Sequence, residues 1–134
     1  MKSAKDYEQL YIQNGFLWNN YLSDFVQEYG GKEIEYPDFR TGSSETANFC
    51  WPSLINVGRH YPQHELTAKY FGEEFAPVGD CNRKHIELLL LESGRLVGFA
   101  DYLLLTWGEN SYDWRSSVKS LLAGVEPVKI GLID

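Results

Sequence analysis

Residues 85–99 read HIELLLLESGRLVGF, and this stretch limits the possible folds more than any other part of the chain. Two apolar runs flank the dipeptide Ser-Gly, which is typical of a tight turn, so the stretch predicts a β-hairpin. Four leucines follow one another at 88–91 without polar alternation. Such a run indicates a strand covered on both faces, or one whose outer face meets a helix or a partner.

The neighbouring segments extend this hairpin into a meander of antiparallel strands. A strand is expected from Phe75 through Val78, and YLLLTW at 102–107 predicts another strand after the hairpin. The polar stretch GDCNRK at 79–84 is expected to form the turn that leads into the hairpin, because glycine, aspartate and asparagine tolerate turn conformations. In this interpretation the two cations of the turn face water.

Apolar residues in the first 30 positions recur at intervals of three and four, which predicts two amphipathic helices hinged near Gly15. The second helix is expected to end at Gly30. KEIEYP at 32–37 then alternates like a half-buried strand until Pro37 stops it. The polar run 38–48 contains turn formers and has no period, so it predicts a loop, followed by a short strand at FCW, 49–51.

The rest of the chain completes a single domain. The segment 52–72 predicts a short helical turn and a second helix, and Asn110 or Ser111 is expected to cap a helix that ends at Gly124 and Pro127. A chain of 134 residues that is 43% hydrophobic predicts one domain over 1–134, with its core at about 16–127. The expected fold class is α+β: a mostly antiparallel meander with N-terminal helices and a closing C-terminal helix.

Charge and hydropathy exclude some partners. Twelve Lys and Arg against nineteen Asp and Glu leave a formal net charge of −7, which repels a phosphate backbone and favours basic partners. Nucleic acid is therefore not an expected ligand. The amino end lacks the pattern of a signal peptide, and no stretch approaches the roughly 18 apolar residues that span a bilayer. We therefore expect a cytoplasmic protein with no membrane partner.

The chain offers no clear catalytic or metal-binding motif. Five potential ligands are scattered singly: Cys50, His60, His64, Cys81 and His85. They lack the paired spacings of a zinc site, and Pro62 interrupts the helix that would align the two closest histidines, so no metal or other cofactor is expected. Cys81 and His85 could act as nucleophile and base only if the turn folded them together; otherwise Cys81 lies in a loop and His85 opens a strand. We expect a protein that is not an enzyme.

Four pieces of the chain match a family pattern in their order and spacing: FVQEYGG at 25–31, FAPVGDCNRKHIELLLLESGRLVGF at 75–99, WGEN at 107–110 and SLLAGVEP at 120–127. Together they resemble the SUKH superfamily (Smi/Knr-like domains), and within it the third branch of bacterial immunity proteins. The matching positions are Gly30, Gly31, Pro77, Val78, Gly79, Gly94, Arg95, Leu121, Leu122, Gly124 and Pro127. The resemblance extends from about Phe25 to Pro127; the segment 38–48 does not match the pattern, and DYLLLTWGEN at 101–110 is bulkier than the pattern.

The resemblance implies an immunity protein that binds and neutralises the cognate toxin domain of a bacterial polymorphic or contact-dependent toxin system. A basic nuclease is one candidate for that toxin, because an acidic protein would meet it quickly through electrostatic attraction. The alternative is an intracellular protein-binding scaffold or regulatory domain of the same superfamily with no toxin partner. A homodimer through an exposed sheet edge also stays open.

Two stretches interleave acids with aromatic residues near chain turns, and we take them as the candidate partner-binding residues. The candidate anchors are Tyr36, Phe39, Tyr112 and Trp114, flanked by the acids Glu33, Glu35, Asp38, Glu109 and Asp113. The alternative is that Tyr36 and Trp114 are core residues with solvated acids beside them. Trp114 favours that alternative, because it lies on the apolar stripe of the expected C-terminal helix.

Overall fold

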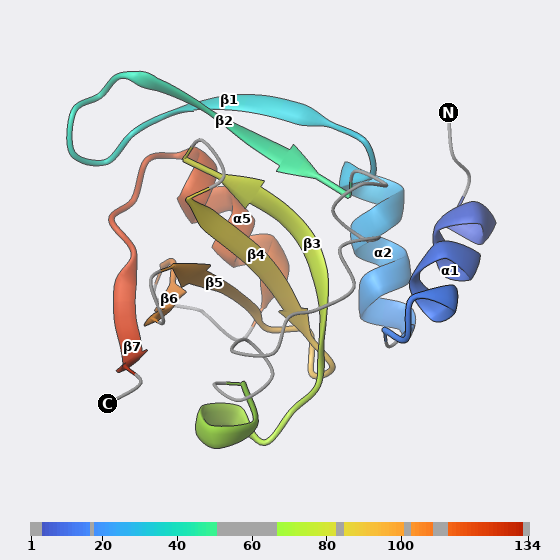
Figure 1. The fold of residues 1–134 in the computed structure, drawn as a ribbon. Coiled ribbons are helices and arrows are strands. Elements are labelled where there is room, and N and C mark those ends of the chain that lie inside the picture. The colour runs from blue at the N-terminus through green and yellow to red at the C-terminus, as the bar shows by residue number, and fades with distance from the viewer. Residues whose placement is uncertain are drawn as a thin grey trace.

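One seven-stranded antiparallel sheet forms the body of the protein, and its spatial order follows the sequence (Figure 1). The computed structural model describes residues 4–16, 18–50, 67–82, 85–100, 103–108 and 113–132. The strands are β1 (Glu33–Pro37), β2 (Ser44–Phe49), β3 (Phe75–Cys81), β4 (Ile86–Leu91), β5 (Leu96–Ala100), β6 (Leu103–Thr106) and β7 (Val128–Leu132). The helices are α1 (Ala4–Gln13), α2 (Asn20–Tyr29) and α5 (Trp114–Leu122). The predicted α+β class, with a meander sheet, N-terminal helices and a C-terminal helix, is confirmed.

The predicted central hairpin is confirmed as β4 and β5. Gly94 adopts φ +92° in the connecting turn, a conformation that glycine reaches without steric cost. Leu88 and Leu90 of β4 are buried in one apolar cluster, whereas Leu89 and Leu91 are buried in a second. Because successive side chains of a strand point to opposite faces, β4 is covered on both faces. This is one of the two arrangements that the run of four leucines predicts.

Helices α2 and α5 pack on one face of the sheet, where the larger apolar cluster lies (Figure 1). The ring of Phe25 in α2 lies 5.8 Å from that of Phe49 in β2 and 4.8 Å from that of Trp114 in α5, centroid to centroid. Asn19 positions the start of α2, because its side chain accepts a hydrogen bond from the backbone nitrogen of Leu22 at 3.0 Å. Buried aromatic rings thus join both ends of the chain to the sheet.

The smaller apolar cluster lies on the opposite face of the sheet. Its buried members are Phe75, Leu89, Leu91, Val97 and Leu104. Phe16, which follows α1, and Phe71, in the helical stretch 67–71, pack against it. The expected helix within 52–72 is therefore seen at 67–71, and residues 52–66 lie outside the described residues. No helix among the residues described is both long enough and apolar enough to cross a membrane.

A bulge in β3 lets two strands approach closely. The register of β3 with β4 shifts between Pro77 and Gly79. A Cβ atom on Gly79 would lie 2.4 Å from the carbonyl oxygen of Asn48 in β2, so only glycine fits here without moving a strand. Tyr11 of α1 donates a hydrogen bond to the Pro77 carbonyl oxygen at 2.6 Å, which satisfies a buried acceptor at the bulge.

The loop prediction for residues 38–48 is wrong in its second half. Ser44–Phe49 forms β2, which pairs along its length with β1, and only residues 38–43 form the connecting turn. The carboxylate of Asp38 stabilises this turn by accepting hydrogen bonds from the backbone nitrogens of Arg40 at 3.3 Å and Thr41 at 3.2 Å. Small polar residues favour strands weakly, and pairing with β1 overcomes that local preference.

The turn prediction for GDCNRK is also only partly right. Gly79–Cys81 belongs to β3, so the connection to β4 consists of residues 82–85. Asn82 adopts φ +52°, and its carbonyl oxygen accepts a hydrogen bond from the backbone nitrogen of His85 at 3.1 Å. His85 precedes β4, which begins at Ile86, and Cys81 ends β3 instead of lying in a loop. The two cations at 83 and 84 lie outside the described residues.

The C-terminal part differs from the prediction in two places. The N-cap of α5 is Asp113, whose side chain accepts a hydrogen bond from the backbone nitrogen of Arg115 at 3.2 Å. Asn110 and Ser111, the predicted caps, lie outside the described residues. After α5 the chain adds β7, which pairs with β6 and for which the sequence predicts no element. The helix therefore precedes the last strand and does not end the fold.

Candidate partner-binding surface

A row of polar side chains crosses four neighbouring strands on one face of the sheet. Glu33 of β1 pairs with Asn48 of β2, and Asn48 in turn pairs with Asp80 of β3. Asp80 then pairs with Glu87 of β4. Because paired residues of antiparallel strands point to the same face and strands lie about 4.8 Å apart, the row spans about 15 Å. We call Glu33, Asn48, Asp80 and Glu87 the acidic row.

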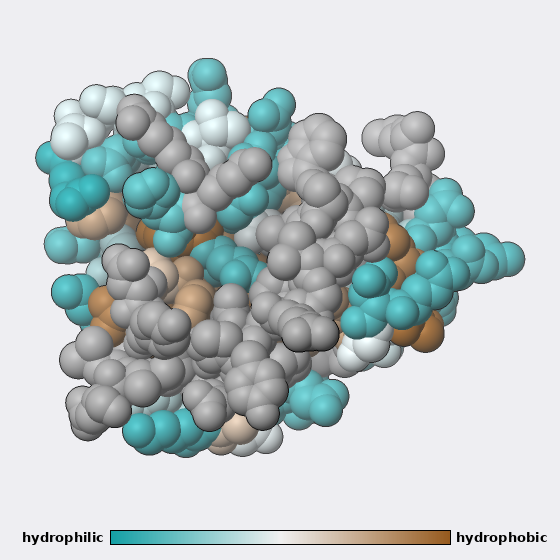
Figure 2. Space-filling model, viewed as in Figure 1, coloured by the Kyte–Doolittle hydropathy of each residue, from teal (hydrophilic) through white to brown (hydrophobic). Residues whose placement is uncertain are grey.

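The acidic row has three carboxylates and one amide. The side-chain nitrogen of Asn48 donates a hydrogen bond to a carboxylate oxygen of Asp80 at 2.9 Å, which separates Asp80 from Glu33. In the next strand the register continues from Glu87 to Phe99, where the apolar cluster of this face begins. The acidic row therefore crosses β1–β4 and ends beside a residue that packs against this cluster. Figure 2 shows hydrophilic side chains over the β1–β2 hairpin, at the upper left of the view.

Of the candidates in and after β1, the acids at the start are accessible and the tyrosine is not. Glu33 and Glu35 are exposed, whereas Tyr36 is only 5% exposed. The Tyr36 hydroxyl accepts a hydrogen bond from the backbone nitrogen of Asn82 at 3.1 Å and contacts the Asn82 side-chain oxygen. Burial raises the pKa of Tyr36, so its hydroxyl stays protonated. Tyr36 is thus a core residue, which is the alternative left open for it.

Asp38 and Phe39 lie at the other end of β1 from Glu33. Asp38 is 7% exposed, and its carboxylate is occupied by the turn that follows β1. Phe39 is half-buried, and the guanidinium carbon of Arg40 lies 5.5 Å from the centre of its ring. Asp38 therefore has a structural role in the turn, whereas Phe39 keeps part of its ring at the surface.

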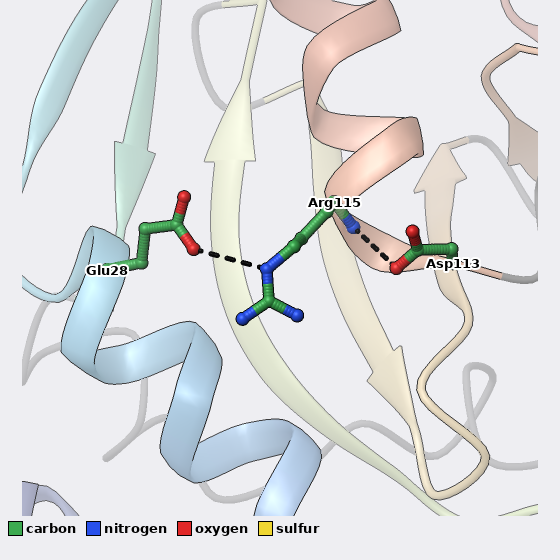
Figure 3. A network of polar contacts seen from close by, with 3 residues as sticks. All are labelled: Glu28, Asp113 and Arg115. Carbon is green, nitrogen blue, oxygen red and sulfur yellow. Dashed lines mark hydrogen bonds and ion pairs between the residues drawn. The ribbon is translucent and has the colours of Figure 1, made fainter.

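The second candidate stretch meets the C-terminal turn of α2 (Figure 3). Trp114 is 1% exposed, and its ring centroid lies 6.1 Å from that of Tyr29 in α2. Asp113 is exposed, and Arg115 forms a surface ion pair with Glu28 of α2 at 3.5 Å. Trp114 is therefore a core residue, again the alternative left open for it, and Asp113 is the accessible acid of this stretch.

Only some of the candidates in the two stretches are accessible in the structure. Glu33 follows the end of α2 by four residues, and Asp113 lines the hollow between α2 and α5. Phe39 lies at the far end of β1. Glu109 and Tyr112 lie outside the described residues. The accessible candidates are therefore Glu33, Glu35 and Asp113, with part of Phe39.

The two cysteines are unsuited to nucleophilic chemistry. Both are buried and neither forms a disulfide. Burial raises the pKa of Cys50 to about 12 and that of Cys81 to about 12, so both thiols are protonated at neutral pH. The hydroxyl of Tyr11 lies 3.7 Å from the Cys50 sulfur, but its one hydrogen is donated to the Pro77 carbonyl oxygen at 2.6 Å. His85 is exposed, whereas Cys81 is buried.

The described part of the chain contains no group of side chains placed to hold a metal, and two of its surface hollows are polar. No group of three or more His, Cys, Asp and Glu side chains there is placed to hold a metal ion, and His60 and His64 lie outside it. A hollow of about 380 Å³ opens beside the 38–43 turn, and another of about 360 Å³ lies between α2 and α5. Mixed charged and polar side chains line both hollows, and the second contains the Glu28–Arg115 ion pair.

Sequence reasoning found the acids of β1 but missed the rest of the acidic row. Asn48 fell in a predicted loop, and Asp80 and Glu87 belonged to a predicted turn and hairpin. Their alignment depends on the register of four strands, including β2. Only the alternation of polar residues with Ala47 and Phe49 in the sequence 44–49 could have indicated that β2 exists.

Comparison of the chain with family models, with curated proteins and with solved structures found no significant match.

Proposed function

We propose that this protein is a non-enzymatic immunity protein that acts in the cytoplasm and neutralises a basic toxin domain by binding it. The resemblance of the segments 25–31, 75–99, 107–110 and 120–127 to the SUKH superfamily supports the class of protein. The acidic row places three carboxylates on one sheet face. It is the observation from which we infer that the partner is basic. Clustered carboxylates attract a basic partner and speed its association.

The state of the two cysteines supports inhibition by binding over a reaction that uses a thiol nucleophile. Both thiols are buried and protonated, so neither is placed to act as a nucleophile at neutral pH. Binding energy would come from the exposed acids Glu33, Glu35 and Asp113 and from the accessible part of Phe39. A toxin that binds nucleic acid is basic because it must neutralise the negative phosphates. This acidic chain would repel the same phosphates.

Affinity capture from a lysate of the source cells tests this proposal. The tagged protein is incubated at low and at moderate salt, and the retained proteins are identified by mass spectrometry. We expect one basic toxin domain that is retained less well as the salt concentration rises, because screening weakens attraction between surface charges. Coexpression should then restore the growth of cells that the toxin inhibits.

Two results would overturn the proposal. Recovery of a resident signalling protein in place of a toxin would favour the scaffold function of the same superfamily. Capture of a toxin without rescue of growth would show that binding does not neutralise it. A capture that does not depend on salt would remove the electrostatic part of the proposal while leaving the immunity function in place.

A further inference from the structure

Strand β1 lies at one edge of the sheet. The sheet order places β2 on one side of β1 and no strand of the described residues on the other (Figure 1). An edge strand presents backbone N–H and C=O groups that can pair with a strand of another molecule. The side chains of β1 and the direction of its backbone groups therefore determine which partners can add there.

The hydrogen bonds that flank β1 show which of its residues point outward. The backbone nitrogen of Phe49 donates to the Lys32 carbonyl oxygen at 2.9 Å, and the nitrogen of Asp38 donates to the Ser43 carbonyl oxygen at 2.8 Å. In an antiparallel pair the bonded residues alternate, so even-numbered residues from 32 to 38 bond to β2. Residues 33, 35 and 37 therefore direct their backbone groups to the open edge.

Only two residues of this edge offer both a donor and an acceptor. Residue 37 is proline and has no N–H to donate. Its carbonyl oxygen lies 2.9 Å from where a Cβ atom of Gly124 would be, so the chain after α5 abuts this end of the edge. Among the described residues, no hydrogen bond from another element reaches the backbone of Glu33 or Glu35. The open part of the edge is therefore centred on these two glutamates.

The charges at the edge disfavour a second copy and favour a basic segment. Both Glu33 and Glu35 are exposed, and their neighbours across the strand are the uncharged Asn48 and Thr46. Two β1 strands paired with each other would place glutamate against glutamate, which is destabilising, whereas lysine or arginine opposite each glutamate is stabilising. Asp80, which lies beyond Asn48 in the acidic row, adds negative charge.

We propose that the open edge of β1 is the docking site for an extended basic segment of the protein partner, which adds to the sheet as a further antiparallel strand. Lysine or arginine side chains of that segment lie opposite Glu33 and Glu35, and its backbone bonds to the outward groups of the same two residues. This inference rests on the proposed function only in requiring a protein partner. It holds for a basic partner that is not a toxin.

A model peptide tests the inference without knowledge of the partner. The probe is acetyl-Thr-Lys-Val-Lys-Val-Thr-amide, and the same peptide with glutamate in place of lysine is its control. Amide hydrogen exchange of the ¹⁵N-labelled protein is measured by NMR with and without saturating peptide. We expect exchange at the amides of Glu33 and Glu35 to slow by at least about threefold with the basic peptide and not with the acidic one, because new backbone hydrogen bonds protect them.

Two variants locate the effect. Glu33→Lys with Glu35→Lys should abolish the protection, whereas Glu74→Lys with Glu126→Lys should retain it. All four residues are exposed, and each double variant raises the net charge from −7 by the same four units, so long-range attraction is matched. Glu35→Pro should also abolish protection at Glu33, because it removes an outward N–H that the pairing with β2 does not use. Circular dichroism checks that the variants fold.

Opposite results would overturn the inference. It is wrong if the basic peptide slows exchange at neither glutamate, or if the Glu33→Lys, Glu35→Lys variant retains the protection. These results are distinguishable from failure of the proposed function. A captured toxin that binds this variant as tightly as the original protein would refute edge docking alone, whereas peptide protection without any captured toxin would refute the immunity function alone.

Discussion

Tyr11 and Pro77 are 66 positions apart in the sequence, and the hydroxyl of Tyr11 donates a 2.6 Å hydrogen bond to the carbonyl oxygen of Pro77. Tyr11 lies in α1, near the start of the chain, and is fully buried. Pro77 begins the bulge of β3. The hydroxyl therefore satisfies a buried carbonyl beside the bulge and ties the first helix to the middle of the sheet.

Tyr11→Phe should lower the free energy of unfolding by about 1–3 kcal/mol, because the Pro77 carbonyl oxygen would lose its buried partner. Chemical denaturation measures this change. Tyr21→Phe is the control, since Tyr21 is 48% exposed and its hydroxyl can bond to water, so its effect should stay within about 0.5 kcal/mol. Equal stability of the two variants would contradict the role given to Tyr11.

Gly79→Ala should destabilise the protein by about 1–3 kcal/mol or more, because its Cβ atom would lie 2.4 Å from the Asn48 carbonyl oxygen and push β2 away from β3. Gly15→Ala is the comparison: Gly15 has φ +80° but no atom within 4 Å of the added carbon, so it should cost only about 1–2 kcal/mol of backbone strain. Chemical shifts of β2 residues should move in the first variant and not in the second. Unchanged shifts in β2 would argue against the close approach.

Asp113→Ala should reduce stability by about 1 kcal/mol, because α5 would lose the side chain that accepts a hydrogen bond from the backbone nitrogen of Arg115. Asp113→Asn should keep most of that stability, since asparagine is also a good N-cap. Thermal unfolding compares the two. If both variants were equally destabilised, the negative charge and not the cap would be responsible.

Ser117→Ala should leave stability unchanged or raise it by about 0.5–1 kcal/mol. The hydroxyl of Ser117 is fully buried without a hydrogen-bond partner in the described structure, and alanine removes this cost while favouring the helix. Ser116→Ala, on the less buried side of α5, changes helix preference alone and should gain less. A loss of more than about 1 kcal/mol in Ser117→Ala would show that the hydroxyl is satisfied after all.

The two thiols should make the protein less stable at alkaline pH. Their pKa is raised from 9.0 to about 12 by burial, so above pH 9 the unfolded chain loses protons that the folded chain keeps. This contribution to the free energy of unfolding is fully present below pH 9. It falls as the pH rises toward 12, by up to about 1.4 kcal/mol per pH unit for each thiol. Denaturation from pH 7 to 11 measures the fall.

Alanine at Cys50 and at Cys81 should flatten that alkaline dependence, leaving the part due to the buried tyrosines. In the unaltered protein a thiol reagent at neutral pH should label both cysteines about a thousandfold more slowly than an unfolded control, because the thiolate fraction falls tenfold per unit of pKa. Rapid labelling of Cys81 in the folded state would instead reopen a catalytic role for it.

Local sequence patterns predicted the elements in which the spacing of apolar residues matches the positions that are buried in the structure. The hairpin of β4 and β5 followed from the four leucines and the Ser-Gly turn, and α1 and α2 followed from apolar spacing. The same patterns failed at β2, where Ser44, Thr46 and Asn48 read as a loop, and at β7, which the sequence did not predict. Both strands exist because a neighbouring strand supplies backbone partners, which no local pattern records.

For the candidate surface, the sequence alone identified the acids Glu33, Glu35 and Asp113, because charged residues beside predicted turns can be read directly from the sequence. The apolar stripe of its helix pointed to a core position for Trp114, which packs against Tyr29. The sequence left Tyr36 open, because its bond to Asn82 joins distant segments.

The α+β class and the central hairpin were determined by the sequence by itself, since hydrophobic periodicity specifies which faces are buried. Only the tertiary structure decided that the acids at 33, 80 and 87 share one row, because side chains align across strands through the register of the whole sheet.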